Sequence, residues 1–271
     1  MNLPLPLLLL AAAAALLLLG WIGLKIPPRP FPPFPTGAPP METLPLPSSL
    51  PAPVERFYRA LYGEQAPRIT SAVISGRGRL RLGGLTFQAR FRFTHVAGQA
   101  YRHYIEATFF GLPLMRVNEH YLEGKARLEL PVGVSEGSKI DQGANLALWA
   151  ESIWLPTVWI TDPRLRWEPV NEDTALLAAP FGSQEEIFVI RFNPQTGLLH
   201  ILESMRYKDE ASQAKILWIN EVRQWSRVSG GLQPAESAVT WQDDGKPWAV
   251  FFTEEVVYNA PVETYVRARG A

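Results

Sequence analysis

The 271-residue chain contains no cysteine. This absence excludes disulfide bonds, thiolate metal sites, iron–sulfur clusters, thiol nucleophiles and a lipidated N-terminal cysteine. The chain also has no excess charge of either sign, because 26 Lys and Arg balance 26 Asp and Glu. A nucleic-acid-binding domain is usually distinctly basic, so we expect no nucleic-acid partner. The 11% of aromatic residues, with nine Trp among them, argues against a disordered chain.

Several catalytic signatures are missing as well. The chain has no P-loop, no H-E-x-x-H helix and no dinucleotide-binding fingerprint, and we assign no catalytic residue from a motif. The four histidines are scattered, at His95, His103, His120 and His200. Strand pairing can bring His103 beside His120, but the spacing does not require it. We therefore interpret the histidines as ordinary strand residues and predict neither a metal site nor a cofactor.

Residues 1–26 form the longest apolar stretch. No charged side chain occurs from Leu3 to Leu24, and about 20 apolar residues suffice for a helix to cross a bilayer. A signal peptide would have a positively charged segment before the stretch and a small-x-small cleavage site close after it, and the chain has neither. We predict a retained, single-pass transmembrane anchor in contact with the lipid bilayer, with a cleaved signal peptide as the alternative.

A proline-rich linker is predicted over residues 27–53. Proline fixes φ and removes a backbone donor, so we expect neither helix nor sheet, but a stiff spacer that holds the following domain clear of the bilayer. Lys25 and Arg29 follow the anchor, and the positive-inside rule taken literally would place that domain in the cytoplasm. A tethered all-β domain is typical of exported proteins, and by this analogy we expect an extracytoplasmic domain.

Residues 54–271 are predicted to form one mainly β domain. The clearest signal is a hairpin with the turn Gly83-Gly84, in which Leu82 pairs with Leu85 and apolar residues share one face while arginines share the other. Short connections between the strands favour antiparallel pairing. Further strand-like runs cover 101–109, 115–122, 126–130, 175–179, 187–192, 198–207, 215–225, 239–241 and 248–258.

Two helices are predicted within this domain. The first covers 54–62, where apolar residues recur at i, i+3, i+4 and i+7, and Gly63 ends it. The second covers 141–154, with Asp141 as its N-cap and Pro156 closing it. A twisted antiparallel sheet that is wrapped around or covered by this second helix fits the order of the elements.

Several short motifs follow one another in a recognisable order. They are an entry helix, a Phe110-Gly111 turn, Tyr-Leu-Glu-Gly at 121–124, the stretch 148–156 with Glu151 and Trp154, Trp167, a Phe-x-x-x-x-Gly turn at 192–197, Arg206, Trp241 and Val-Val-Tyr-Asn at 256–259. In order and spacing, residues 54–259 resemble an uncharacterised family of bacterial membrane-anchored β proteins.

The resemblance implies a curved, half-open antiparallel barrel with one helix packed inside. This architecture is similar to that of LolA- and LolB-like periplasmic lipoprotein carriers, which shield acyl chains in the concave face. The family implies no activity, because a shared fold does not establish function.

Glu151 is the most informative single residue. On a helix its neighbours at i±3 and i±4 are all apolar, so its carboxylate must either pair with a cation or have a raised pKa. Candidate partners are Arg164, Arg166 and Arg206. We predict a structural ion pair or hydrogen bond, with ligand contact and then catalysis as alternatives. The predicted ligand contacts are Glu151, Trp154, Trp167, Arg206 and Trp241.

The polar face of the first hairpin is a dense cationic strip. It suits anionic lipid headgroups, because each basic residue near a membrane surface adds about 1 kcal/mol of attraction. The alternative, which we favour, is a solvated outer face neutralised by a neighbouring strand, for instance through Glu106. The strip consists of Arg77, Arg79, Arg81, Arg90 and Arg92.

The predicted function is a membrane-tethered, non-enzymatic module that binds a lipid or another apolar ligand inside a β half-barrel. A structural protein of the cell envelope, with a packed barrel and an unknown protein partner, is the first alternative. An enzyme built around Glu151 is the second.

Overall fold

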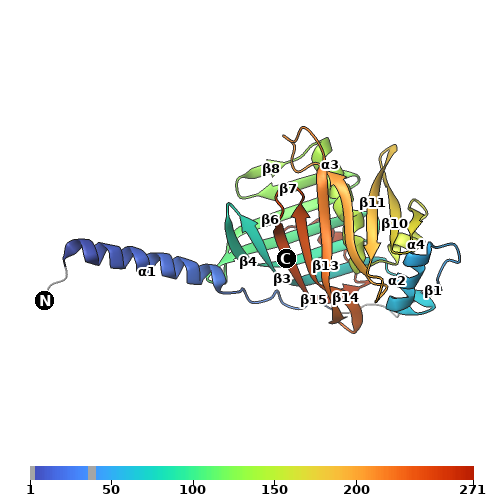
Figure 1. Ribbon diagram of the computed structural model, residues 1–271, viewed down its shortest axis with the longest axis horizontal. Helices are drawn as coiled ribbons and strands as arrows, with labels where there is room; N and C mark the ends of the chain where they lie inside the picture. The colour runs from blue at the N-terminus through green and yellow to red at the C-terminus, as the bar shows by residue number, and fades with distance from the viewer. Residues whose placement is uncertain (1–3, 36–40) are drawn as a thin grey trace.

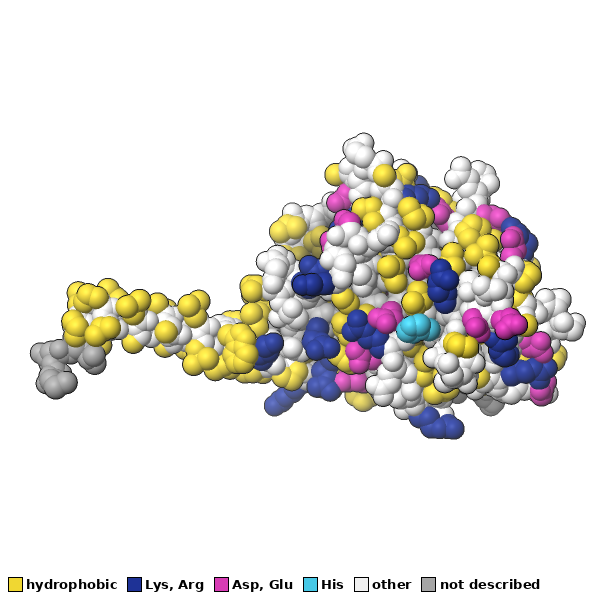
Figure 2. Space-filling view, in the orientation of Figure 1, with side chains coloured by type: hydrophobic (Ala, Val, Ile, Leu, Met, Phe, Trp, Pro, Cys, Tyr) yellow, Lys and Arg dark blue, Asp and Glu magenta, His cyan; other side chains and the backbone are white. Residues whose placement is uncertain are grey.

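A computed structural model describes residues 4–35 and 41–271. One long helix, α1 (Leu5–Lys25), extends from a β-rich body (Figure 1). Its 21 residues span about 31 Å, close to the roughly 30 Å of a bilayer's hydrocarbon core. Figure 2 shows hydrophobic side chains along the helix, and basic side chains on the body near its base. The helix is long and apolar enough to be a membrane span or a signal sequence.

The body is built on one antiparallel sheet of thirteen strands, in the order β8-β7-β6-β5-β4-β3-β15-β14-β13-β12-β11-β10-β9. The strands are β3 (Ser71–Leu82), β4 (Leu85–Val96), β5 (Ala100–Phe109), β6 (Leu112–Leu122), β7 (Lys125–Leu130), β8 (Gly133–Ser135), β9 (Arg166–Asn171), β10 (Thr174–Phe181), β11 (Gln184–Phe192), β12 (Leu199–Arg206), β13 (Ile216–Val228), β14 (Gly231–Trp241) and β15 (Pro247–Tyr258). The pairing of β3 with β15 joins the first six strands to the last seven. The edge strands β8 and β9 do not pair with each other, so the sheet stays open.

Helix α3 (Ser138–Ala150) and the 3₁₀ helix η1 (Glu151–Trp154) lie inside the curve of the sheet, where residues 141–150 are all buried. The Asn145 side chain accepts a hydrogen bond from Tyr121 on β6 (3.2 Å) and donates one to the Pro180 carbonyl on β10 (3.0 Å). Antiparallel sheets of more than about ten strands usually curl. Here the sheet curls around α3, and the predicted mainly β, half-open architecture with an internal helix is confirmed.

The predicted hairpin register is also confirmed. Leu82 pairs with Leu85 and Leu80 with Phe87, and the strip of arginines lies on the outer, convex face. Phe91 and Phe93 continue the apolar face into the concave core, where both pack against Phe251 of β15 at 5.0 and 5.4 Å between ring centroids.

Helix α2 (Ala52–Tyr62) covers one end of the core. Phe57 and Tyr58 are fully buried, and the Tyr58 hydroxyl donates a 2.5 Å hydrogen bond to the Pro156 carbonyl. Burying one such aromatic side chain contributes about 1.5–3 kcal/mol. Gly63 ends the helix with a φ of 71°, as its position in the sequence predicts.

The start of α3 differs from the prediction. The helix begins at Ser138, so Asp141 lies in its first turn and is not the N-cap. Its carboxylate accepts hydrogen bonds from the Ala126 backbone N–H and from Lys125 Nζ, both at 2.8 Å. Asp141 therefore joins the helix to β7. Short elements that lack strong periodicity were not predicted: β1 (Thr43–Pro45), β2 (Gln65–Pro67), β8, β9, α4 (Val158–Thr161) and α5 (Glu263–Val266).

The spacer predicted over residues 27–53 is wrong in its described part, because this segment packs on the body. The Phe31 ring packs at a tilt against Tyr104, with 5.7 Å between ring centroids, and Phe34 is buried on the convex face. Pro32 accepts a hydrogen bond from Arg92, and Thr43–Pro45 pairs with β2. Backbone carbonyls of this segment remain strong acceptors, and Arg90 and Arg92 of the convex face donate to those of Arg29 and Pro32. Residues 36–40 lie outside the described part.

Gly76 allows the sheet to bend where its two halves meet. It pairs with Thr253 at a bulge in β15, and a Cβ at this position would collide with the Phe252 carbonyl oxygen. Glycines in strand interiors often mark such bends or close backbone approaches.

We expect Gly76→Ala to destabilise the protein by about 2 kcal/mol or more, because the backbone of β3 or β15 must shift. The matched control is Gly231→Ala on β14, where the nearest atom is the flexible end of Gln233 at 3.3 Å. Thermal unfolding of the two full-length variants measures the difference. Equal melting temperatures would contradict this account of the bend.

Candidate functional site

The concave face of the sheet encloses two adjoining chambers. The outer chamber has a volume of about 480 Å³ and lies between the β3–β7 arm, α3 and the end of β12. The inner chamber, of about 110 Å³, lies under η1 against β4, β5 and β12–β15. Ile105, Glu119, Arg206 and Trp248 line both chambers. Cavities of roughly 300–1,000 Å³ with apolar walls and a few polar groups are typical ligand sites.

Three hairpin tips lie along one edge of the sheet, at the open side of the outer chamber. They are the turns between β3 and β4, β5 and β6, and β7 and β8. Large apolar side chains are exposed there, up to 94% for Val132, and Leu82 and Val132 also line the chamber. The exposed apolar residues of these tips, which we call the rim, are Leu82, Leu85, Phe110, Leu112, Leu114, Val132 and Val134.

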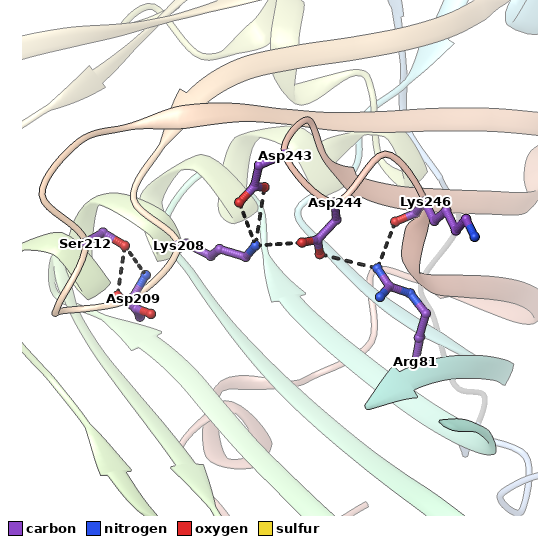
Figure 3. A network of polar contacts seen from close by, with 7 residues as sticks. All are labelled: Arg81, Lys208, Asp209, Ser212, Asp243, Asp244 and Lys246. Carbon is purple, nitrogen blue, oxygen red and sulfur yellow. Dashed lines mark hydrogen bonds and ion pairs between the residues drawn. The ribbon is translucent and has the colours of Figure 1, made fainter. Parts of the chain in front are cut away.

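An ionic network connects three elements beside this opening (Figure 3). Lys208 Nζ, after β12, contacts Asp243 (3.2 Å) and Asp244 (3.0 Å) in the β14–β15 turn. Asp244 pairs in turn with Arg81 near the end of β3 at 3.3 Å, and Arg81 donates to the Lys246 carbonyl at 3.1 Å. Exposed pairs are individually weak, but a network of several charges restrains the loops that it joins.

The inner end of the cavity carries a buried polar cluster. Glu151 Oε2, at the start of η1, lies 2.6 Å from His103 Nε2 on β5 and 3.1 Å from His95 Nε2 on β4. The other ring nitrogen of His103 lies 3.4 Å from Glu119 Oε2 on β6. The Tyr101 hydroxyl donates a 2.6 Å hydrogen bond to Glu119 Oε1. Four elements thus bring two carboxylates and two imidazoles together.

The two histidines of this cluster differ in their bonding. His103 contacts a carboxylate through each nitrogen and stacks on Tyr101 at 4.1 Å. His95 is 1% exposed, and its Nδ1 has no hydrogen-bond partner among the described residues. Its Nε2 contacts Glu151 Oε2 at 3.1 Å, the same oxygen that His103 contacts.

The pKa values follow from this arrangement. Burial favours the neutral forms, which raises the pKa of Glu151, but the two histidines outweigh it and hold that pKa at about 2. Burial likewise disfavours the His103 cation, but Glu151 and Glu119 together raise its pKa to about 9. Burial dominates at His95 and lowers its pKa. The site therefore holds Glu151 ionised and His103 protonated at neutral pH, with His95 neutral.

Arg206 lies where the two chambers meet. Its guanidinium is 4.5 Å from the Trp218 ring and 5.8 Å from the Trp241 ring, and it packs over Gly143 of α3. Its Nε has no hydrogen-bond partner within the part of the chain that the structure describes. A cation held on aromatic rings with an unused donor can bind an anionic group.

A family model matches residues 40–253 of the chain, which is most of the β body. The chain belongs to a family of unknown function, DUF6544. The resemblance to an uncharacterised family of β proteins is thereby confirmed. No curated protein matches the chain.

Solved structures with a similar sheet come from three bacteria. A LolA superfamily protein of Nitrosomonas europaea is 9% identical, covers 82% of this chain and 99% of its own, and has a TM-score of 0.47. A putative outer membrane lipoprotein-sorting protein domain of Vibrio parahaemolyticus is 11% identical, covers 79% of this chain and 92% of its own, and has a TM-score of 0.42. A DUF1329 family protein of Desulfovibrio piger is 13% identical, covers 74% of this chain and 90% of its own, and also has a TM-score of 0.42. Similarity at this level bears on neither ligand nor activity.

Four of the five predicted ligand contacts in this DUF6544 member line the cavity. Glu151 and Trp154 line the inner chamber, Trp241 the outer one, and Arg206 both. Trp167 does not line either chamber; it packs edge-on against Trp159 at 6.1 Å and donates to the Trp159 carbonyl. Its position on the edge strand β9 explains the difference, and ligand contact stays a prediction for the other four.

The partners of Glu151 differ from those we expected. Arg164 pairs with Asp162, and Arg166 pairs with Glu168 and Glu185. His95 and His103 take their place, and His103 lies beside His95 instead of His120. The alternation of apolar and polar residues could have predicted that the two histidines share a face. Extending the pattern of the first hairpin past the turn near Gly98 puts both of them on the concave face. Glu119 gave no comparable signal.

The arginine strip is mostly neutralised within the chain. Arg90 pairs with Glu106 at 2.6 Å, as we expected, while Arg77 pairs with Glu254 and Arg81 with Asp244. Arg92 donates to Ser75, and Arg79 lies over the Phe252 ring. Contact of this face with anionic lipid stays a prediction.

The chain also carries a G-x-S-x-G pattern, a signature of some hydrolases, at residues 133–137. Its Ser135 lies on the short edge strand β8, opposite Leu128. Within the described residues no histidine or carboxylate is hydrogen-bonded to it, as a Ser-His-Asp arrangement would have.

The raised pKa of His103 predicts a loss of stability in alkaline solution. Between about pH 6.5, the ordinary value, and about pH 9, the folded chain keeps a proton that the unfolded chain has lost. Stability therefore falls as pH rises through this window. We expect His103→Gln to flatten the decline, and His200→Gln, an exposed position, to leave it unchanged. Chemical denaturation in chelator-containing buffer measures the slopes; identical slopes in wild type and His103→Gln would contradict the assignment.

Proposed function

We propose that the chain is a membrane-tethered, non-enzymatic binding protein that holds a lipid or another apolar ligand in the cavity of its half-barrel. The observation that carries the proposal is the outer chamber, which is apolar along its walls and opens at the rim. Its walls come from both arms of the sheet and from α3, and include Ala107, Met115, Val117, Leu128 and Ile140.

The rim and α1 support entry of the ligand from the bilayer. The Phe110 backbone N–H donates a 2.8 Å hydrogen bond to the Gly23 carbonyl, and Gly23 is buried against this tip. The last turn of α1 thus docks on one of the three tips that form the rim. If α1 crosses the membrane, the rim lies at the lipid surface. Exposed apolar patches of this kind mark membrane or protein contacts.

The polar groups of the cavity favour an amphiphile with an anionic end. Arg206 offers an unused donor between the chambers, and Lys139 and Lys208 lie at the outer one. Both lysines are already bonded, Lys139 to two carbonyls and Lys208 to two aspartates. Arg206 is therefore the group that we assign to the ligand's polar end. We place the body on the extracytoplasmic side, following the analogy to exported β domains.

Filling the outer chamber should displace the ligand. We expect full-length Val117→Trp, purified in detergent from membranes of the source organism, to carry less than half the bound lipid of Val170→Trp by native mass spectrometry. Val170 is a matched control, since it is exposed on the distant edge strand β9. Both variants retain α1, so lipid held around the helix cancels in the comparison.

Two results would count against the proposal. Equal lipid on both variants would mean that lipid binds only around α1. A wild-type chain that stays free of lipid after incubation with membrane lipids would favour the alternative, a packed envelope protein that binds another protein.

The exposed apolar rim leads to a second prediction. Because the chain contains no cysteine, a single introduced cysteine can be labelled specifically. We expect a bimane label on Val132→Cys, in the full chain in proteoliposomes, to emit at shorter wavelength than in detergent-free aqueous reference peptides and to be shielded from iodide. The control is Val170→Cys, exposed on the distant edge strand β9. Equal quenching of the two labels would show that the rim does not enter the lipid.

A further inference from the structure

The buried cluster at the inner end of the cavity contains an unexplained feature. His95 is almost completely buried, its Nδ1 has no hydrogen bond among the described residues, and its Nε2 shares the single oxygen Glu151 Oε2 with His103. Leaving a buried polar group unpaired is destabilising, and such groups in native proteins usually indicate an ion, a water molecule or a functional role. A simple ion pair between Glu151 and His103 does not account for His95.

We propose that His95, His103 and Glu151 bind a divalent transition-metal ion, for which Zn²⁺ is the best-fitting candidate. One ligand atom of each residue converges from a different element, β4, β5 or η1, and the three atoms all lie within 4.8 Å of one another. Bonds of about 2.0–2.2 Å to nitrogen and oxygen place tetrahedral zinc ligands roughly 3.4 Å apart. The observed spacings of 2.6 and 3.1 Å from Glu151 reach this value with a small rotation of that side chain.

The surroundings of His103 match those of a metal ligand. Metal-binding histidines usually donate their second ring N–H to a carboxylate, which fixes the ring and its tautomer. Glu119 is in that position, 3.4 Å from His103 Nδ1, and is itself held by the Tyr101 hydroxyl. In this arrangement Nε2 of His103 faces Glu151, and the proposed ion takes the place of the proton that Nε2 carries in the metal-free protein.

The three ligands leave one coordination position for the cavity. His103 and Glu151 both line the inner chamber, next to apolar walls. Zinc sites with three protein ligands keep such an open position for water or a ligand oxygen. Imidazole and carboxylate donors without any thiolate are compatible with Zn²⁺, Fe²⁺ and Mn²⁺, and the chain contains no cysteine. The metal site does not depend on the lipid-binding proposal.

Metal content of the full chain tests the site. The protein is purified in detergent through a tag without histidine, stripped with EDTA, incubated with Zn²⁺ and freed of excess ion by gel filtration. We expect one zinc per chain by mass spectrometry of the metal. His95→Asn and Glu151→Gln should fall to background, while His200→Asn, on the surface, should keep one. Glu119→Gln should weaken binding about 10–100-fold, because it only orients His103.

A second measurement needs no substitution, so misfolding cannot obscure it. Co²⁺ added to the stripped wild-type chain should give the visible absorption of a four- or five-coordinate nitrogen and oxygen site, and Zn²⁺ should displace it. The proposal is overturned if wild type takes up no more zinc than His95→Asn, or if Co²⁺ shows only its aqueous spectrum. Either result would leave Glu151 and His103 as a structural ion pair.

Discussion

The hydrogen bonds of α3 to both arms of the sheet determine the shape of this protein. Asn145 bonds to β6 on one side and to β10 on the other. One turn earlier, Asp141 bonds to β7, and Gln142 bonds to Glu186 and to the Met205 carbonyl. These polar side chains are buried, so losing any partner leaves an unpaired group at a cost of about 1–3 kcal/mol. The helix therefore fixes how far the two arms stand apart, and the cavity is the space that it does not fill.

The same helix explains why the inner chamber is polar at one end. After Ala150 the chain tightens into η1, and this change brings Glu151 against β4 and β5 instead of against the apolar walls. A buried carboxylate without partners would be neutral, and the two imidazoles reverse that tendency. Replacing a buried ion pair by apolar residues is often neutral or stabilising, so stability alone does not require this cluster. Its position beside an apolar chamber is consistent with a functional role.

Sequence patterns predicted most of the sheet because period-2 alternation and glycine turns are local. The register of the Gly83-Gly84 hairpin follows from residues a few positions apart, and so does the end of α2 at Gly63. The order of the elements allowed a sheet wrapped around or covered by the second helix, and the family resemblance was needed to predict the curved half-barrel. The histidine cluster depends on how η1 meets β4, β5 and β6, which no local pattern encodes. Alternation could still have placed His95 and His103 on one face, whereas the choice of Glu151 as their partner required the tertiary fold.

In the proline-rich segment, the backbone conformation was predicted correctly but the position of the segment was not. Proline does exclude helix and most sheet pairing, and residues 27–35 contain neither. The rule says nothing about docking, however, and the arginines of β4 donate to backbone carbonyls of this segment while their planes pack on Phe31. The chain's own linker thus supplies hydrogen-bond acceptors and an aromatic surface to the arginines of the convex face. Because the linker is folded back, α1 ends against the β5–β6 tip instead of several nanometres away. A stiff spacer would have separated the cavity from the membrane, whereas this arrangement keeps the rim next to the base of the helix.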